Sequence, residues 1–276
     1  MKTSLFTLAA LGLVACSSQP KTDVADSASH SLVLYYSQVG ATRTVALELQ
    51  SQLGADIAQI EAQPAYDGDF QQTIARCQQE MAEGTLPELK ALDVDLARYD
   101  TIYLGYPIWF GTYATPIASL VKQHTFEGKT IIPFCTFGSG GLQASASQLA
   151  AALPQANVLE GYGVRTVRVA AAPAELNRFL IERGYKAGQI EALPAYMEAH
   201  PVTADEAAVF DQACSSYQYP LGTPVTVAVR TTSTSTDYLF TAASQGPDGQ
   251  ESTSEVYVTL PNEEGAVAEF TQVVRK

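Results

Sequence analysis

Three short segments rich in glycine, hydroxyl and aromatic residues are the parts of this 276-residue sequence best suited to bind a ligand. The first runs from Ser37 to Thr42 and places a glycine turn between two hydroxyl side chains. At the start of a helix, such a turn presents backbone N–H groups that favour a phosphate or another anion. The same pattern also occurs as an ordinary turn with a helix N-cap, so both interpretations stay open.

Two further segments combine aromatic residues with glycine. Residues 106–112 contain Trp109, the only tryptophan of the chain, next to Phe110. A large aromatic side chain is costly to leave exposed in a loop, so we expect Trp109 to pack against protein or against a flat ligand. Residues 135–141 are rich in glycine, and a backbone without side chains can approach the edge of a ring closely.

The three segments follow predicted β-strands, and this position decides whether they meet. Short apolar runs alternate with segments whose apolar residues have helical spacing, such as Val45, Leu49 and Leu53. The predicted strands are residues 31–36, 55–60, 101–105, 130–134 and 157–161, and the predicted helices are residues 42–53, 71–83, 116–122, 144–152 and 174–185. This alternation predicts a parallel sheet covered by helices on both faces. Ligands of such sheets bind beyond the carboxyl ends of the strands.

Taken together, the three segments resemble the loops of flavodoxin. They are more similar still to those of a flavodoxin-like family of bacterial proteins, whose loops read YSxTGNT, GYPIWWG and TSGGSG. The corresponding residues here are YSQVGAT at 36–42, GYPIWFG at 105–111 and CTFGSGG at 135–141. The resemblance covers about residues 31–185. It implies an α/β, flavodoxin-like fold, with a five-stranded parallel sheet in the order 2-1-3-4-5, that binds FMN non-covalently.

The resemblance also implies which residues would surround FMN. The phosphate would lie among Ser37, Val39, Gly40, Ala41 and Thr42. One side of the isoalloxazine would be lined by Pro107, Ile108, Trp109, Phe110 and Gly111, and the other by Thr136, Phe137, Gly138, Ser139, Gly140 and Gly141.

Several of these positions depart from the family pattern, among them Phe110, which stands where tryptophan is commoner and is a conservative change for stacking. Val39 replaces a common threonine and Ala41 an asparagine, which removes two side-chain donors to the phosphate. Each lost charge-assisted hydrogen bond costs about 1.5–3 kcal/mol where nothing replaces it. Phe137 stands where serine is usual, and its ring could stack on the flavin or block the pocket.

The sequence therefore fits two functions from different classes. The first is FMN-dependent electron transfer, by an electron carrier or by an oxidoreductase that reduces small acceptors, with the chemistry supplied by the cofactor. The alternative is a binding or scaffold lipoprotein of the cell envelope that keeps the fold but no longer binds flavin tightly. We predict no catalytic residues and no metal ligands, because the three histidines, His30, His124 and His200, are scattered along the sequence.

The first 30 residues are typical of export and membrane anchoring. Met1-Lys2 is a short basic start, an apolar run follows, and Leu13-Val14-Ala15-Cys16 resembles the lipobox of bacterial lipoproteins. The resemblance implies that residues 1–15 form a signal peptide, that Cys16 carries the lipid, and that residues 16–30 are a flexible tether. An ordinary secretory signal with an incidental cysteine is the alternative. We expect a lipid-anchored protein of the bacterial cell envelope.

Composition restricts the possible partners. The net charge is −13, which argues against binding nucleic acid, and 46% hydrophobic residues suffice for a substantial core. Besides Cys16 the chain has Cys77, Cys135 and Cys214, so those three can form at most one disulfide among themselves. The predicted partners are FMN, a redox partner or small acceptor, and the membrane through the anchor on Cys16.

The last part of the sequence predicts a second, smaller domain. Residues 31–185 form the flavodoxin-like domain, residues 186–201 a linker, and residues 202–276 an α+β domain. Its helix spans residues 203–213 and starts with a capping-box pattern, and strands at 223–231, 237–244, 255–260 and 267–274 alternate with period two. We expect a structural or partner-binding role for this domain, with Tyr217 and Tyr219 packed between the two domains.

Overall fold

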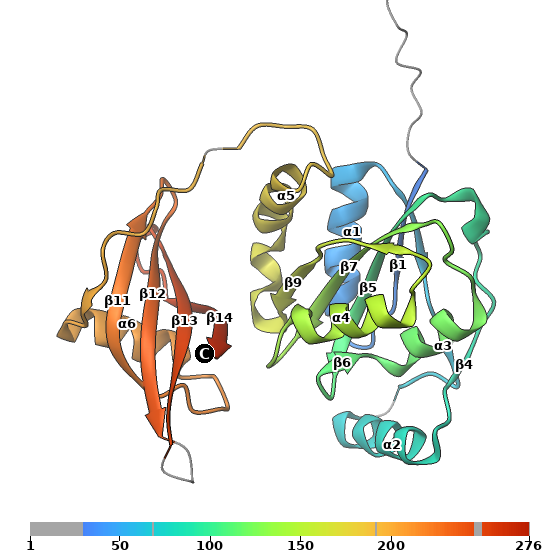
Figure 1. Ribbon diagram of the computed structural model, residues 1–276, viewed down its shortest axis with the longest axis horizontal. Coiled ribbons are helices and arrows are strands. Elements are labelled where there is room, and N and C mark those ends of the chain that lie inside the picture. The colour runs from blue at the N-terminus through green and yellow to red at the C-terminus, as the bar shows by residue number, and fades with distance from the viewer. Residues whose placement is uncertain (1–29, 68, 191, 246–249, 276) are drawn as a thin grey trace, which may run out of the picture.

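The computed structural model describes residues 30–67, 69–190, 192–245 and 250–275 (Figure 1). The predicted signal peptide, Cys16 and all of the tether except His30 lie outside the described residues. Within the described ranges, no helix is both long and apolar enough to cross a bilayer.

A parallel sheet forms the centre of the larger domain. Its strands lie in the order β2-β1-β5-β7-β8, and each neighbouring pair is parallel. The strands are β1 (Ser31–Tyr35), β2 (Asp56–Gln59), β5 (Thr101–Trp109), β7 (Thr130–Phe137) and β8 (Asn157–Val158). In chain order this is 2-1-3-4-5, so the predicted flavodoxin-like fold is confirmed.

Helices cover both faces of this sheet (Figure 1). α1 (Ala41–Leu53) and α5 (Ala172–Glu182) pack on one face, and α3 (Thr115–Gln123) and α4 (Leu142–Ala152) on the other. α2 (Phe70–Glu83) lies at the bottom of Figure 1, away from the strands. Alternate residues of β1 belong to separate cores: Leu32 and Leu34 pack with α3 and α4, whereas Val33 and Tyr35 pack with α1 and α5. Successive side chains of a strand point to opposite faces, so continuous apolar runs fit a sheet buried on both sides.

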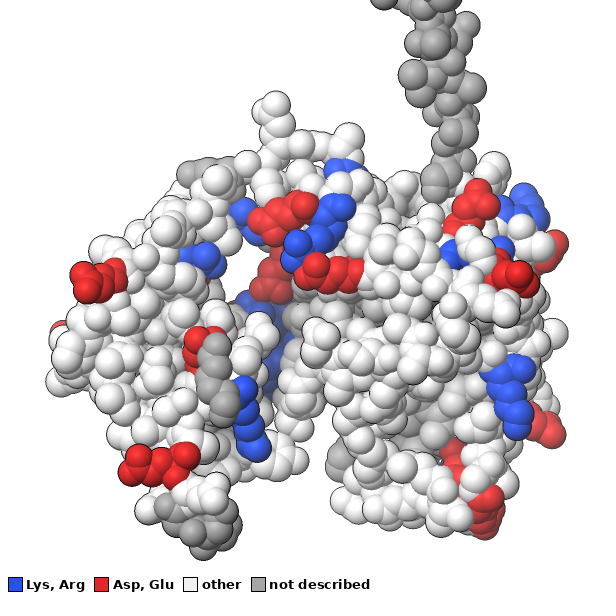
Figure 2. Space-filling model, in the orientation of Figure 1, with Lys and Arg blue, Asp and Glu red and all other residues white. Residues whose placement is uncertain are grey.

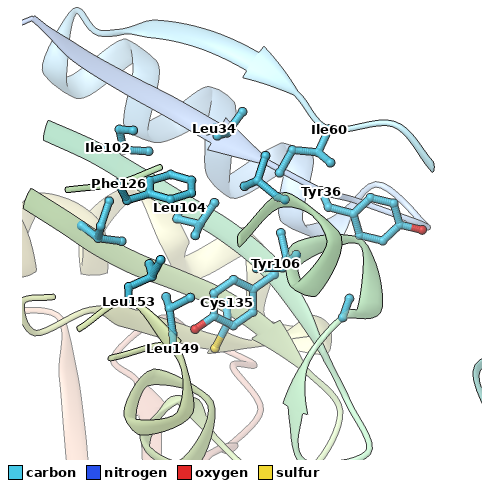
Figure 3. Close-up of a cluster of buried hydrophobic side chains, with 14 of the residues drawn as sticks. Leu34, Tyr36, Ile60, Ile102, Leu104, Tyr106, Phe126, Cys135, Leu149 and Leu153 are labelled. Atoms are coloured by element: carbon cyan, nitrogen blue, oxygen red, sulfur yellow. The ribbon is translucent and has the colours of Figure 1, made fainter. Parts of the chain in front are cut away.

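Figure 3 shows the first of these cores. Tyr36 stands at its edge, at the carboxyl end of β1, and the Cys135 sulfur lies beside Tyr106 and Leu149. Tyr106 and Cys135 have no exposed surface. The cores thus extend to the residues that precede the three candidate loops, which gives those loops a rigid base.

Two central strands continue beyond their predicted ends. β5 reaches Trp109 instead of Gly105, because it pairs with β7 as far as Pro107 and then turns back to pair with β6 (Thr112–Tyr113). β7 reaches Phe137 instead of Phe134 and pairs there with β9 (Tyr162–Arg165). Residues predicted as loop therefore lie on paired strands.

The fifth strand is interrupted and resumes as β9. β7 pairs with β8 up to Ile131 and with β9 from Phe134 onward, and Pro133 lies opposite the break. Proline has no N–H to contribute to a sheet ladder. Gly161 passes this point so closely that a Cβ atom there would lie 2.1 Å from the Pro133 carbonyl oxygen.

The remaining elements of this domain are short strands and 3-10 helices. β3 (Ala62–Gln63) and β4 (Glu88–Leu89) form a short antiparallel pair. Two 3-10 helices, η1 (Leu96–Arg98) and η2 (Thr166–Ala171), precede β5 and α5 respectively.

The C-terminal part is an antiparallel sheet with one helix, as predicted. The strands lie in the order β10-β11-β12-β13-β14. They are β10 (His200–Pro201), β11 (Thr223–Thr231), β12 (Ser235–Gln245), β13 (Glu251–Pro261) and β14 (Glu269–Arg275), and the helix is α6 (Ala204–Cys214). Phe210 of α6 packs edge-on against Phe240 of β12 at 5.1 Å between ring centroids, in a core of its own.

Candidate functional site

The three glycine and aromatic segments meet around one cavity of about 670 Å³ at the carboxyl ends of β1, β5 and β7. Small-molecule sites commonly have volumes of about 300–1,000 Å³. The first segment contributes Gln38, the second residues 108–111, and the third Gly138 and Ser139. Further lining residues are Thr73, Ile74 and Cys77 of α2, Arg165 and Val167 from the end of the fifth strand, and residues 216–219.

The first segment leaves the start of α1 open to an anion. Gly40 precedes α1 with a left-handed φ of 92°, and its N–H donates to the Ser37 hydroxyl oxygen at 3.2 Å. No side chain caps the helix, and its first turn holds no acidic residue. The first N–H groups of a helix have no partner within it, and together with the helix dipole they favour negative charge.

The remaining residues of this segment differ in exposure. Val39 is 80% exposed, whereas Thr42 is buried and its hydroxyl bonds to the Thr136 hydroxyl of β7 at 2.8 Å. Gln38 donates through Nε2 to the Thr73 hydroxyl of α2 at 2.7 Å. The segment is thus held from two sides, by β7 and by α2.

The second segment is a tight hairpin that presents two aromatic rings. Trp109 and Thr112 are paired, and the two residues between them, Phe110 and Gly111, have φ values of 50° and 80°. Positive φ at both central positions is the geometry of a two-residue hairpin turn, and it is unusual for phenylalanine. Phe110 is half exposed at the cavity. Pro107 does not line the cavity, and its carbonyl oxygen accepts a hydrogen bond from the Ala114 N–H.

Trp109 is fixed by other aromatic rings. It packs edge-on against Tyr36 at 5.6 Å and Tyr66 at 5.1 Å between ring centroids. The Tyr66 hydroxyl donates to Glu80 at 2.5 Å, and the Arg76 guanidinium lies 3.7 Å from the centre of the Tyr66 ring. These contacts hold Trp109 in place before any ligand binds.

Burial makes the groups behind Trp109 hard to ionise. It raises the pKa of both Tyr36 and Tyr66 well above 10, with a further increase from the Glu80 carboxylate. It also raises the pKa of the Cys77 thiol to about 11. At neutral pH these three side chains are therefore neutral.

The third segment is divided between two hollows. Gly138 and Ser139 line the cavity, while Gly140 and Gly141 line an adjoining hollow of about 780 Å³ beside α4 and β14. Phe137 lines that second hollow and packs on the core. Its ring is therefore not part of the lining of the first cavity. Thr136 lies below the cavity, bonded to Thr42.

Arg165 is a lining residue that the sequence did not predict. It is the last residue of β9, beyond the predicted end of the fifth strand at Gly161, and no sequence motif includes it. The residue is only 7% exposed, and its Nε donates to the Gly138 carbonyl at 3.2 Å. Burial lowers the pKa of this guanidinium, but arginine remains protonated at neutral pH. The site thus contains a positive charge in a strongly acidic chain.

Most of the surface on the face shown in Figure 2 is uncharged, and a hollow opens between the two domains in its lower half, with charged side chains gathered above it. This agrees with the 16% of charged residues in the sequence. Among the described residues, Cys77, Cys135 and Cys214 are free thiols, and no group of three metal-ligating side chains is close enough to hold an ion.

Fold and loops together define a flavodoxin-type site, and comparison with known proteins gives the family. The chain belongs to the flavodoxin family: a family model described as flavodoxin matches residues 30–175, more than half of the sequence. The match includes all three loops of the site.

Similar solved structures cover about half of this chain. A protein from Bacteroides uniformis assigned as a flavoprotein is 27% identical over 53% of this chain and 97% of its own, with a TM-score of 0.48. One from Bacteroides eggerthii is also 27% identical over 53% and 97%, with a TM-score of 0.45. A flavoprotein from Lactobacillus acidophilus, crystallised in complex with FMN, is 24% identical over 54% and 97%, with a TM-score of 0.45. No curated protein matched the chain.

Proposed function

We propose that this protein binds FMN and transfers electrons to small acceptors at the bacterial cell envelope. The observation that carries the proposal is that all three loops contribute residues to the lining of one cavity, and that the first of these loops leads into a helix without a side-chain cap. Membership of the flavodoxin family supports the choice of FMN.

The loops offer the two kinds of contact that FMN requires. The backbone N–H groups at Ala41 and Thr42 and the Ser37 hydroxyl, whose oxygen accepts from the Gly40 N–H, would hold the phosphate, while Val39 adds no polar group. The second loop, from Pro107 to Gly111, and the third, from Thr136 to Gly141, would hold the isoalloxazine. The residues of this set that line the cavity itself are Ile108, Trp109, Phe110, Gly111, Gly138 and Ser139.

When bound, FMN supplies reversible electron uptake and release, and the chain adjusts how readily that happens. Trp109 and Phe110 would present apolar ring surface to the flavin on the cavity wall that they form. The net charge of −13 disfavours additional negative charge on a reduced flavin, which would lower its reduction potential.

The proposed location rests on the sequence alone. The lipobox-like residues Leu13 to Cys16 would direct export and attach a lipid to Cys16. The flavodoxin-like domain would then be carried at the membrane surface by residues 16–30. Labelling with a radioactive fatty acid in a bacterial host, with Cys16→Ser as the control, tests this part: the label should appear only on the protein that has Cys16.

FMN binding is tested by spectroscopy on the purified protein. The visible absorption of the protein and its quenching of FMN fluorescence in a titration should both report a complex. Trp109→Ala should raise the Kd at least about tenfold, which corresponds to about 1.4 kcal/mol. A colourless protein that leaves FMN fluorescence unchanged at micromolar concentration would favour the alternative, a scaffold that keeps the fold without the flavin.

That alternative has a specific basis in the first loop. The exposed Val39 and the methyl group of Ala41 offer the phosphate no hydrogen bond, so the backbone and the Ser37 hydroxyl must hold it without them. Val39→Thr and Ala41→Asn therefore provide gain-of-function controls, and both should strengthen FMN binding if the phosphate lies at this loop.

A further inference from the structure

The cavity at the three loops is not closed by the flavodoxin-like domain alone. Four consecutive residues of the C-terminal domain, Ser216 to Tyr219, complete its lining. They follow α6 directly, and the Tyr217 N–H donates to the Cys214 carbonyl at the end of that helix. The two tyrosine rings lie 5.8 Å apart, edge to face. The cavity thus has aromatic residues from both domains, with Trp109 and Phe110 from one and Tyr217 and Tyr219 from the other.

Arg165 holds this segment against the third loop. Its Nη1 donates to the Phe270 carbonyl of β14 at 3.3 Å, while its Nε donates to the Gly138 carbonyl. The guanidinium lies 4.6 Å from the centre of the Phe270 ring and 5.3 Å from that of Tyr217. Cation–π contacts of a desolvated arginine stabilise such arrangements. One buried side chain therefore connects the third loop, the C-terminal sheet and Tyr217.

A second arginine joins the domains nearby. Arg168 forms ion pairs with Glu175 of α5 at 2.6 Å and with Glu269 of β14 at 3.1 Å. Burial lowers the pKa of Arg168, but the two carboxylates more than compensate, so its pKa is raised overall. Tyr217 also packs on Phe270 at 4.7 Å between ring centroids. Polar, ionic and aromatic contacts thus join β14 to the flavodoxin-like domain, and Tyr217 is placed there by its contacts with Phe270 and Arg165.

We propose that the C-terminal domain forms the outer wall of the flavin site, with Tyr217 and Tyr219 as its aromatic lining and Arg165 as its positioning residue. The inference rests on the proposed FMN binding. It gives the appended domain a function in the site: a ligand in the cavity contacts both domains.

The first test needs no flavin, because Trp109 is the only tryptophan and lines the same cavity. Acrylamide quenching of tryptophan fluorescence in the full-length protein therefore measures access to the cavity. Tyr217→Ala combined with Tyr219→Ala should increase the quenching constant. Tyr196→Ala is the matched control, because Tyr196 has a cation–π contact with Arg230 at 4.5 Å in the C-terminal part but does not line this cavity. It should leave quenching unchanged.

The second test measures the Kd for FMN of the same variants by fluorescence titration. The double tyrosine variant should bind at least about tenfold more weakly, and Tyr196→Ala like the wild type. Arg165→Leu should increase acrylamide quenching in the same way, although both tyrosines are still present. If Arg165 contributed only to stability, the substitution would lower the melting temperature and leave quenching unchanged.

Each outcome decides between the two proposals. Unchanged quenching in the double variant overturns the outer wall, even where FMN binds. Increased quenching with unchanged FMN affinity would show that residues 216–219 shield Trp109 but do not belong to the flavin site. That result also overturns the inference, and it leaves the proposed function intact. A wild-type protein that binds no FMN refutes the proposed function and the inference with it. A melting temperature for each variant identifies any that fail to fold.

Discussion

The hydrogen bond between the Thr42 and Thr136 hydroxyls, 2.8 Å long, joins the first turn of α1 to β7 directly below the candidate site. The two residues are 1% and 2% exposed, so water does not replace a lost partner. Replacing either threonine with valine keeps the shape of the side chain, removes its hydroxyl and leaves the other hydroxyl buried without its partner.

The expected magnitude follows from this burial. A hydrogen bond contributes about 0.5–1.5 kcal/mol net, but a buried group left without a partner costs about 1–3 kcal/mol. Thr42→Val and Thr136→Val should each lower the free energy of unfolding by about 1–3 kcal/mol. The double variant leaves no orphaned hydroxyl and should lose less than the sum, with a coupling energy of about 1 kcal/mol.

Urea unfolding of the flavin-free protein, followed by circular dichroism, measures all four free energies. Thr253→Val is a suitable control, because Thr253 is exposed on β13, and a substitution there should change stability by less than about 0.5 kcal/mol. Single-variant losses that add within about 0.5 kcal/mol would show that the two hydroxyls are not coupled and that β7 does not hold the first loop in this way.

Three further predictions concern packing, thiol reactivity and pH. Gly105→Ala should destabilise the protein by about 1–3 kcal/mol, since its Cβ would lie 2.1 Å from the buried Phe134 ring, and Phe134→Leu should recover part of the loss in thermal unfolding. Burial raises the pKa of Cys77 to about 11, so at pH 8 this thiol should react with an aromatic disulfide reagent far more slowly than in urea; equal rates would contradict its burial. Burial acts to raise the pKa of Glu206, but the hydrogen bonds from Thr203 lower it by more, so the net pKa is below 4.5. The resulting stabilisation is present above pH 4.5 and is lost as the pH falls, so Thr203→Ala should cost about 1 kcal/mol at neutral pH and show less acid dependence in urea unfolding.

The strands of the parallel sheet were predictable because they are short apolar runs with residues for both cores, and their order was implied by the resemblance to flavodoxin. Val33 and Leu34 illustrate this, since they are adjacent in sequence and belong to opposite cores. The interruption before β9 was not predictable, because it depends on Pro133, which lies on the neighbouring strand. The extension of β5 to Trp109 likewise depends on pairing with residues that follow it.

That the three loops lie together was predictable, because ligands of parallel sheets bind beyond the carboxyl ends of the strands. The structure places Gln38, Trp109 and Gly138, one residue from each loop, around one cavity. The contribution of the second domain to this cavity had no local sequence signal. Packing of Tyr217 between the domains was expected, and its contact with Arg165 agrees with that. The surface of the flavodoxin-like domain that Tyr217 contacts depends on how the two domains dock, and this cannot be predicted from the periodicity of the sequence.

The turn at Phe110 and Gly111 has a consequence for the rate of binding. A left-handed backbone costs a non-glycine residue about 1–3 kcal/mol, and the surrounding hairpin maintains it at Phe110 in the absence of any ligand. The ring is therefore already presented at the cavity, so ligand capture involves no ordering of this loop and no slow conformational step before contact. Association should accordingly follow a single exponential whose rate rises linearly with ligand concentration, as for a preformed receptor.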